Sequence, residues 1–132
     1  MYDTPHRLTY GYPAVAFNGA DIVRIIKNPR PGSKGKVTSI NVHSTTTFAG
    51  DTTLPKVQVG DGVTANKYAD VQPGALAAGA AYIGKNAATG IKAVDIPHVL
   101  TATGGDLTVT FKAATGAGAA GVADIHIAVE WG

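Results

Sequence analysis

The preference for branched over linear side chains is the feature that most constrains how this chain can fold. It contains 37 isoleucine, valine and threonine residues, against 17 leucine, glutamate, methionine, glutamine and lysine residues together. β-Branched side chains lose rotamer freedom in a helix and pack well on a pleated sheet. With one glutamate and five leucines, the chain has little from which to build long amphipathic helices. The composition therefore predicts an all-β fold.

Length and cysteine content narrow the possibilities further. The chain has 132 residues, which fits one domain. It contains no cysteine, so disulfides, thiolate chemistry and cysteine zinc sites are excluded. No run of 18 apolar residues occurs, and we therefore expect no contact with a membrane through a spanning segment.

Alternation of apolar and polar residues predicts short strands along the chain. The two clearest segments are DLTVTFKA (106–113) and ADIHIAVEW (123–131), in which every second residue is large and apolar. In the second of them, His126 falls on the polar face. Further strands are expected at 12–17, 20–27, 36–43, 54–59, 81–84 and 91–99.

Frequent turn signals between these segments indicate how the strands are arranged. Alternating strands must bury one face, and about eight of them separated by glycine, proline and asparagine turns predict a single antiparallel β-sandwich of jelly-roll type. We expect this sandwich to span residues 14–132. The alanine-rich stretch 74–81 could form one or two helical turns, and AATGAGAAG (113–121) predicts a flexible loop or a crossing where small residues let two backbones approach.

The first 13 residues, MYDTPHRLTYGYP, differ from the rest of the chain. They contain three tyrosines, one arginine and two prolines, with no strand alternation. Tyrosine offers large amphipathic area and is favoured in protein interfaces. We expect residues 1–13 to form an extended N-terminal arm, which either covers an edge of its own sandwich or reaches a neighbouring molecule.

Positive charge is concentrated in the first quarter of the chain. Residues 1–36 carry a net charge of +4 and the remainder a net charge of −2. The segment KNPRPGSKGK (27–36) predicts an exposed loop, either a solvated turn or a contact with an acidic partner. Because the aromatic residues precede this loop, and only Arg24 lies within an apolar strand, we expect no nucleic-acid partner.

No motif for catalysis, cofactor binding or metal binding is present, so the chain is not expected to be an enzyme. None of the three serines lies in a nucleophile elbow. The four histidines are too widely separated for a metal-ligand motif, and each is interpreted as a surface or hydrogen-bonded residue. The sequence Gly60-Asp61-Gly62 lacks the frame of a calcium loop and predicts a hairpin turn. The serines and histidines are Ser33, Ser39, Ser44, His6, His43, His98 and His126.

Four segments give the chain a family resemblance. They are MYDTPHRLTYGYP, LPKVQVGDGVTANKYAD, GALAAGAAYIG and TGAGAAGVADIHIAVEWG. In style the chain resembles the capsid decoration, or cement, proteins of tailed bacteriophages. That resemblance implies a small β-rich virion protein, made in the host cytoplasm, that binds the outer surface of the capsid, ties adjacent major capsid protein subunits together, and forms a homo-oligomer, with a trimer favoured.

The resemblance transfers no catalytic residues, so the expected capsid contacts follow from position in this chain alone. Arm and basic-loop residues are the candidates, and deletion of 1–13 is expected to abolish capsid binding while leaving the sandwich folded. The candidate contacts are Tyr2, Arg7, Tyr10, Tyr12, Arg30, Lys34 and Lys36.

Two other functions stay open on the sequence. One is a carbohydrate- or receptor-binding module of a phage fibre or head appendage, with Tyr68, Tyr82, Asp70 and Asn86 as candidate residues. The other is an enzyme built on the same sandwich, for which a carboxylate pair could exist without a recognisable motif.

Overall fold

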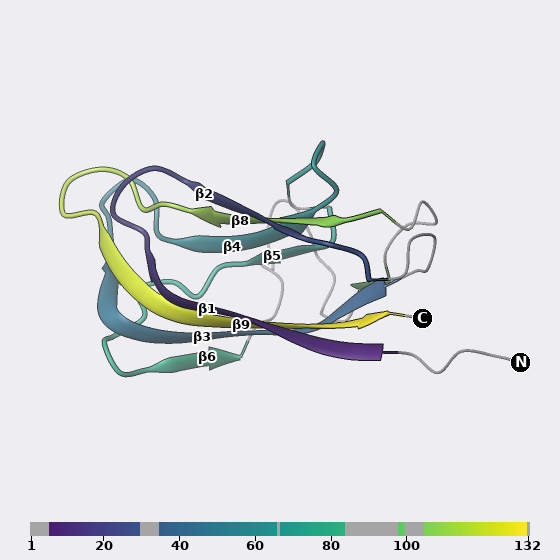
Figure 1. Ribbon diagram of the computed structural model, residues 1–132. Coiled ribbons are helices and arrows are strands. Elements are labelled where there is room, and N and C mark those ends of the chain that lie inside the picture. Colours follow the sequence, from purple (N-terminus) through teal and green to yellow (C-terminus); the bar gives the residue numbers. More distant parts are fainter. Residues whose placement is uncertain (1–5, 30–34, 66, 84–97, 100–104, 132) are drawn as a thin grey trace, which may run out of the picture.

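Two β-sheets face each other across one core in the computed structural model, which describes residues 6–29, 35–65, 67–83, 98–99 and 105–131 (Figure 1). These residues contain strands and turns but no helix. The strands are β1 (His6–Ala16), β2 (Ile22–Ile26), β3 (Gly35–Ala49), β4 (Lys56–Gly60), β5 (Ala69–Val71), β6 (Ala81–Ile83), β7 (His98–Val99), β8 (Leu107–Lys112) and β9 (Ala120–Trp131).

The pairing of the strands is that of a long hairpin. Strand β1 pairs with β9, β2 with β8, β3 with β6 and β7, and β4 with β5, all antiparallel. Wrapping this hairpin around the core also brings β9 beside β3 and β8 beside β4. The result is one sheet in the order β1-β9-β3-β6, here called the β9 sheet, and a second in the order β2-β8-β4-β5, here called the β8 sheet. This interlocked order is a jelly roll, and the predicted fold class is confirmed.

The core lies between the inner faces of the two sheets. Phe17, which directly follows β1, is fully buried. Its ring centroid lies 5.3 Å from that of Phe48 in β3 and 6.2 Å from that of Phe111 in β8, so Phe17 connects the two sheets. In β8 and β9, the apolar residues of the predicted alternation are buried: Leu107, Val109, Phe111, Ile125, Ile127, Val129 and Trp131.

The N-terminal segment differs from the predicted arm. Residues 6–13 belong to β1, and the register runs from His6 opposite Trp131 to Tyr12 opposite Ile125. The part of the arm that the structure describes is therefore an edge strand of its own sandwich, which agrees with the first of the two expected placements. This strand continues past residue 13 to Ala16, without a boundary between arm and sandwich. Residues 1–5 lie outside the described residues.

The loops correct one smaller prediction and bear out another. The stretch 74–81 forms turns instead of helix, followed by β6, since its glycines and alanines give a helix no apolar face to bury. The crossing expected at 113–121 is present: Ala114 N–H donates to Phe17 O at 2.8 Å, and the Thr53 and Thr115 hydroxyls lie 2.6 Å apart. Strand β9 already begins at Ala120.

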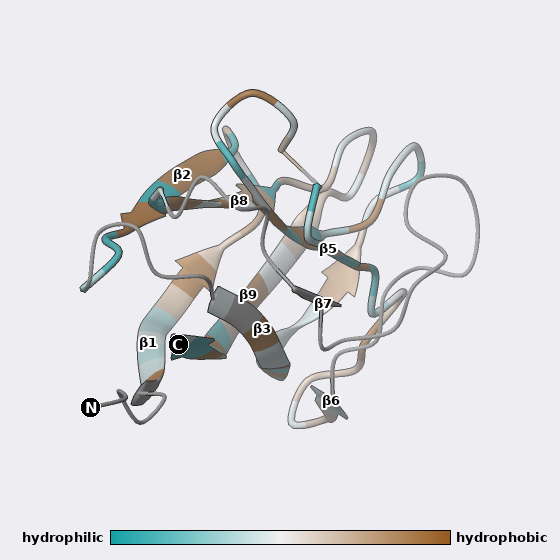
Figure 2. Cartoon of the chain, turned by 90° about the vertical axis from the view of Figure 1, so that its right-hand side faces the viewer, coloured by the Kyte–Doolittle hydropathy of each residue, from teal (hydrophilic) through white to brown (hydrophobic). Residues whose placement is uncertain are grey.

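Hydrophobic residues are not confined to the inner faces of the two sheets. Colouring by hydropathy shows β2 as an almost continuously hydrophobic strand at the rim of the molecule (Figure 2). No helix in the described part of the chain is long and apolar enough to span a membrane.

Candidate binding surface at the open side of the sandwich

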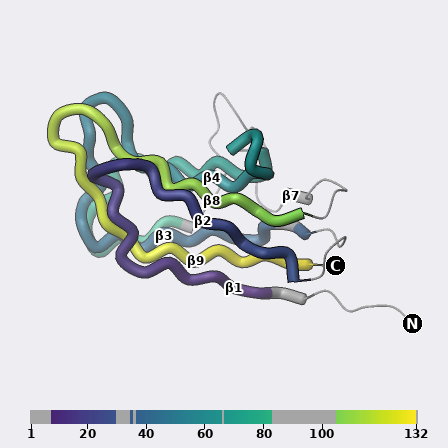
Figure 3. The backbone as a smooth tube through the Cα atoms, turned by 45° about the horizontal axis from the view of Figure 1, so that its top comes forward, coloured from purple at the N-terminus to yellow at the C-terminus, as the bar shows by residue number. Residues whose placement is uncertain are grey.

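The open side of the sandwich is bounded by the two edge strands β1 and β2, one from each sheet. In Figure 3 strand β9 appears between them over most of their length. Strand β1 is the edge of the β9 sheet, and β2 is the edge of the β8 sheet. An edge strand presents unpaired backbone groups and is therefore the part of a sheet most open to further pairing.

Strand β2 exposes two large apolar side chains to solvent. Val23 is 53% exposed and Ile25 is 59% exposed. Both lie on the outer face of the β8 sheet, opposite Thr110 and Thr108 of β8. Two adjacent aliphatic side chains on an unprotected edge are typical of an interaction surface.

Arg24 lies between them on the inner face of the same strand. Its backbone is opposite Val109, whose side chain is buried in the core, yet Arg24 itself is exposed at the edge. The guanidinium Nη1 donates to the carbonyl of Val23 at 3.0 Å. Among the described residues, no carboxylate forms an ion pair with Arg24.

A cleft of about 290 Å³ separates the two edges beside Arg24. Its walls come from residues 12–16 at the end of β1 and from Ile22, Arg24 and Phe111. The Tyr12 ring packs edge-on against Phe111, with 5.3 Å between centroids. Burial raises the pKa of the Tyr12 hydroxyl, as does neighbouring Tyr10, while the positive charge of Arg24 lowers it. The cleft thus combines an apolar floor with a phenol and a guanidinium.

A β-bulge between Tyr12 and Val15 shapes one wall of this cleft. Ala14 takes a φ of 51°, a conformation that non-glycine residues rarely adopt. Its N–H donates to Oδ1 of Asp124 at 2.8 Å, and this bond holds the bulge against β9.

The four predicted capsid contacts that the structure describes are not brought together on one surface. Tyr10 and Tyr12 are half-buried against the core, and the Tyr10 hydroxyl accepts a hydrogen bond from Trp131 Nε1 at 3.3 Å. Arg7 of β1 and Lys36 of β3 lie opposite Glu130 from either side. Tyr2, Arg30 and Lys34 lie outside the described residues.

The outer face of the β9 sheet is polar at its centre. Asn41 lies opposite His126, and His43 lies opposite Asp124. His43 and His126 are exposed, as predicted for surface histidines. Among the described residues, no group of three histidine or acidic side chains is placed to hold a metal ion.

The residues considered for carbohydrate binding do not form an exposed platform. Tyr68 is 3% exposed and Asp70 is fully buried, whereas Tyr82 is half-buried against the core. Asn86 lies outside the described residues. Because a sugar ring stacks on an exposed aromatic face, Tyr68 cannot serve in the predicted role.

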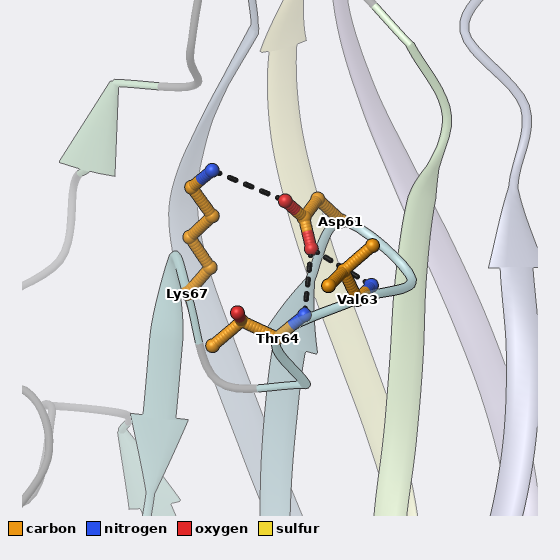
Figure 4. A network of polar contacts seen from close by, with 4 residues as sticks. All are labelled: Asp61, Val63, Thr64 and Lys67. Carbon is orange, nitrogen blue, oxygen red and sulfur yellow. Dashed lines mark hydrogen bonds and ion pairs between the residues drawn. The ribbon is translucent and has the colours of Figure 1, made fainter.

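Asp61 stabilises the turn after β4 (Figure 4). Its Oδ1 accepts from the N–H groups of Val63 at 2.9 Å and Thr64 at 2.8 Å, and its Oδ2 lies 3.1 Å from Lys67 Nζ. The hydrogen bonds from Thr64 and Val63, followed by that from Lys67, lower the Asp61 pKa from 3.8 to about 2. With Gly62 at a φ of +90°, the predicted hairpin turn with a positive-φ glycine is confirmed.

The lowered pKa predicts a specific pH dependence for Asp61→Asn. The folded-state pKa lies below the usual value, so the carboxylate contributes stability above about pH 4 and loses it as the pH falls toward 2. In urea unfolding from pH 7 to pH 2, the difference between wild type and variant should stay constant down to about pH 5 and then shrink. A difference that stays constant down to pH 2 would contradict this interpretation.

The sequence pattern predicts a strand at 20–27 but does not by itself indicate a contact role for Val23, Arg24 or Ile25. The sequence IVRII does carry a signal for such a role, because its apolar residues do not alternate with polar ones although one side of the strand faces solvent.

Comparison with known proteins gives little further information. No protein-family model matches the chain, and no curated protein matches it. A chain from a three-dimensional structure of Maize Chlorotic Mottle Virus, obtained by single particle analysis, aligns over 98% of this chain and 94% of that one. Its sequence identity is 16% and its TM-score is 0.29. Similarity at that level does not define what this chain does.

Proposed function

We propose that this protein is a structural virion protein that binds the outer surface of a tailed-phage head and cements adjacent major capsid protein subunits. The jelly-roll strand order is the observation that carries the proposal, because this topology recurs in viral capsid domains. The resemblance in sequence style to phage decoration proteins supports the finer assignment.

The chemistry of the accessible side chains suits a protein partner. The open side combines exposed aliphatic residues with a cationic one, and interfaces use apolar contacts and arginine in this way. Such a protein stabilises an expanded shell by mass action, since a ligand that binds only the expanded form lowers its free energy at every site. We propose that the protein acts as a homo-oligomer, with a trimer favoured.

Basic residues provide the proposed electrostatic contact with the capsid. Arg7 and Lys36 stay candidates, together with Tyr2, Arg30 and Lys34. Tyr10 and Tyr12 contribute instead by packing within the sandwich. Attraction between exposed charges weakens with salt, so binding should weaken as ionic strength rises.

Electron microscopy of particles tests this function. Purified protein is mixed with unexpanded and with expanded heads assembled from a tailed-phage major capsid protein encoded in the same genome. We expect density at symmetry-related positions on expanded heads only. Arg7→Glu/Lys36→Glu should lower occupancy, whereas Lys56→Glu, on the other sheet, should not. Bare expanded heads at saturating protein would overturn the proposal.

A further inference from the structure

We propose that the free edge of β2 accepts an extended segment of another protein as a fifth strand of the β8 sheet, and that this segment carries an acidic residue between two apolar ones. The inference goes beyond the proposed function, since it concerns a peptide-binding edge that does not require a capsid. It rests on the placement of Val23, Arg24 and Ile25.

The edge is geometrically open. In the described part of the chain, β2 pairs only with β8, so its other side has no strand beside it. Strand addition to such an edge gains main-chain hydrogen bonds, while alternate side chains give specificity. Val23 and Ile25 are both more than half exposed, so the outer face of this strand is accessible to solvent.

Alternation of side chains fixes the chemistry of the incoming segment. Residues directly opposite each other in paired strands lie on the same face of the sheet. Apolar residues of the new strand would therefore lie beside Val23 and Ile25 on the outer face. The residue between them would point to the inner face, beside Arg24 and over the cleft that Tyr12 lines.

Arg24 favours an acidic residue at that position. In the free protein its guanidinium contacts the Val23 carbonyl of its own strand. A carboxylate is a stronger acceptor for a guanidinium than a neutral carbonyl is. The carboxylate of an incoming glutamate would accept the hydrogen bond from the Arg24 guanidinium, and the Val23 carbonyl would then be free to pair with the new strand.

A second copy of β2 fits this edge poorly. Antiparallel pairing centred on Arg24 would place two arginines directly opposite each other, which is destabilising. An antiparallel register centred on Val23 places the apolar Ile25 opposite the charged Asp21. A register centred on Ile25 places the apolar Val23 opposite the charged Lys27. The register centred on Arg24 also places Asp21 opposite Lys27, but these side chains already form ion pairs with Lys112 and Asp106. The arginine pair at the centre therefore favours a foreign acidic strand over self-pairing.

An NMR titration of the full chain tests the proposal. The probe is a capped synthetic peptide, Thr-Thr-Val-Glu-Val-Thr-Thr, and the control peptide carries lysine in place of glutamate. We expect the glutamate peptide to shift the amide resonances of β2 and β8 and to bind about five- to tenfold more tightly than the lysine peptide.

Charge reversal provides the matched variant. Arg24→Glu should reverse the preference between the two peptides, and Arg24→Gln should remove it. Lys56→Glu makes the same charge change two strands away from the edge and should leave the preference intact. Each variant is shown to be folded if the dispersion of its amide resonances matches that of the wild type.

Three results would overturn the inference. They are equal affinity for both peptides, resonance shifts away from β2, and concentration-dependent self-association through β2 in the absence of peptide. Because no capsid is present, failure here would leave the proposed function untouched, and failure to coat phage heads would leave this inference untouched.

Discussion

Deleting residues 1–13 will prevent the sandwich from folding. The deletion removes most of β1 and with it the pairing from His6↔Trp131 to Tyr12↔Ile125. Tyr10 and Tyr12 leave the core, and Trp131 Nε1 loses its acceptor. Loss of two packed aromatic side chains and an edge strand should cost at least about 5 kcal/mol, comparable with the whole stability of a typical domain.

The measurement is the dispersion of amide resonances together with the thermal unfolding transition. The truncated chain should show collapsed dispersion and no cooperative transition. Deletion of 1–5 is the matched control, because it leaves every β1 pair in place, and it should unfold like the full chain. A cooperatively folded 14–132 fragment would show that the sandwich folds without residues 6–13, as expected if residues 1–13 formed an arm outside the sandwich.

Phe17→Ala should be the most damaging single substitution of the aromatic core. Phe17 is fully buried and contacts Phe48 of one sheet and Phe111 of the other. Truncation leaves a cavity at the point where the sheets meet, and such a change costs about 3–5 kcal/mol. For a chain of this length the melting temperature should fall by roughly 10–20 °C.

Calorimetry and urea unfolding measure this effect. Val23→Ala is the control, because Val23 is more than half exposed and its loss should change stability by less than about 0.5 kcal/mol. Similar losses for the two variants would mean that Phe17 does not connect the sheets in the way the ring distances indicate.

Strands with strict alternation were predictable from the sequence. Strands β8 and β9 each alternate apolar and polar residues, and their inner faces are buried as expected. The jelly-roll class followed from many short strands separated by turns. The length of β3, which runs to Ala49 instead of ending at His43, could not be read from its Thr-rich end, because threonine suits both strands and loops.

The first part of the N-terminal strand was missed for a physical reason, whereas residues 12–16 lie within the predicted strand 12–17. Pro13 and Gly11 interrupt the pattern, and proline is tolerated in a sheet only at edges and bulges. Both conditions hold in β1, which is an edge strand with a bulge between Tyr12 and Val15. Tyr10 and Tyr12, which were predicted to contact a partner, are instead part of the sandwich. They lie opposite Ile127 and Ile125 of β9, and the Tyr10 hydroxyl accepts a hydrogen bond from Trp131, more than a hundred positions away.

The candidate surface could be predicted only in part. The sequence identified basic and aromatic residues near the N-terminus as contacts, yet the exposure of Val23 and Ile25 depends on β2 lying at the end of its sheet. Whether a strand lies at an edge depends on the topology of the sheet, and a run such as IVRII is equally typical of a central strand. The sequence of this strand therefore does not show whether its apolar residues are buried in the core or exposed at an edge.

The position of β9 has a consequence for synthesis of the protein. Among the described strands, this one is synthesised after all the others, yet it lies between β1 and β3, and the first described residue, His6, pairs with Trp131. The β9 sheet therefore cannot close while the end of β9 is still inside the ribosome. Until β9 has emerged, the edges of β1 and β3 that it fills in the folded protein stay unpaired, and unpaired edges of this kind expose a growing chain to pairing with its neighbours.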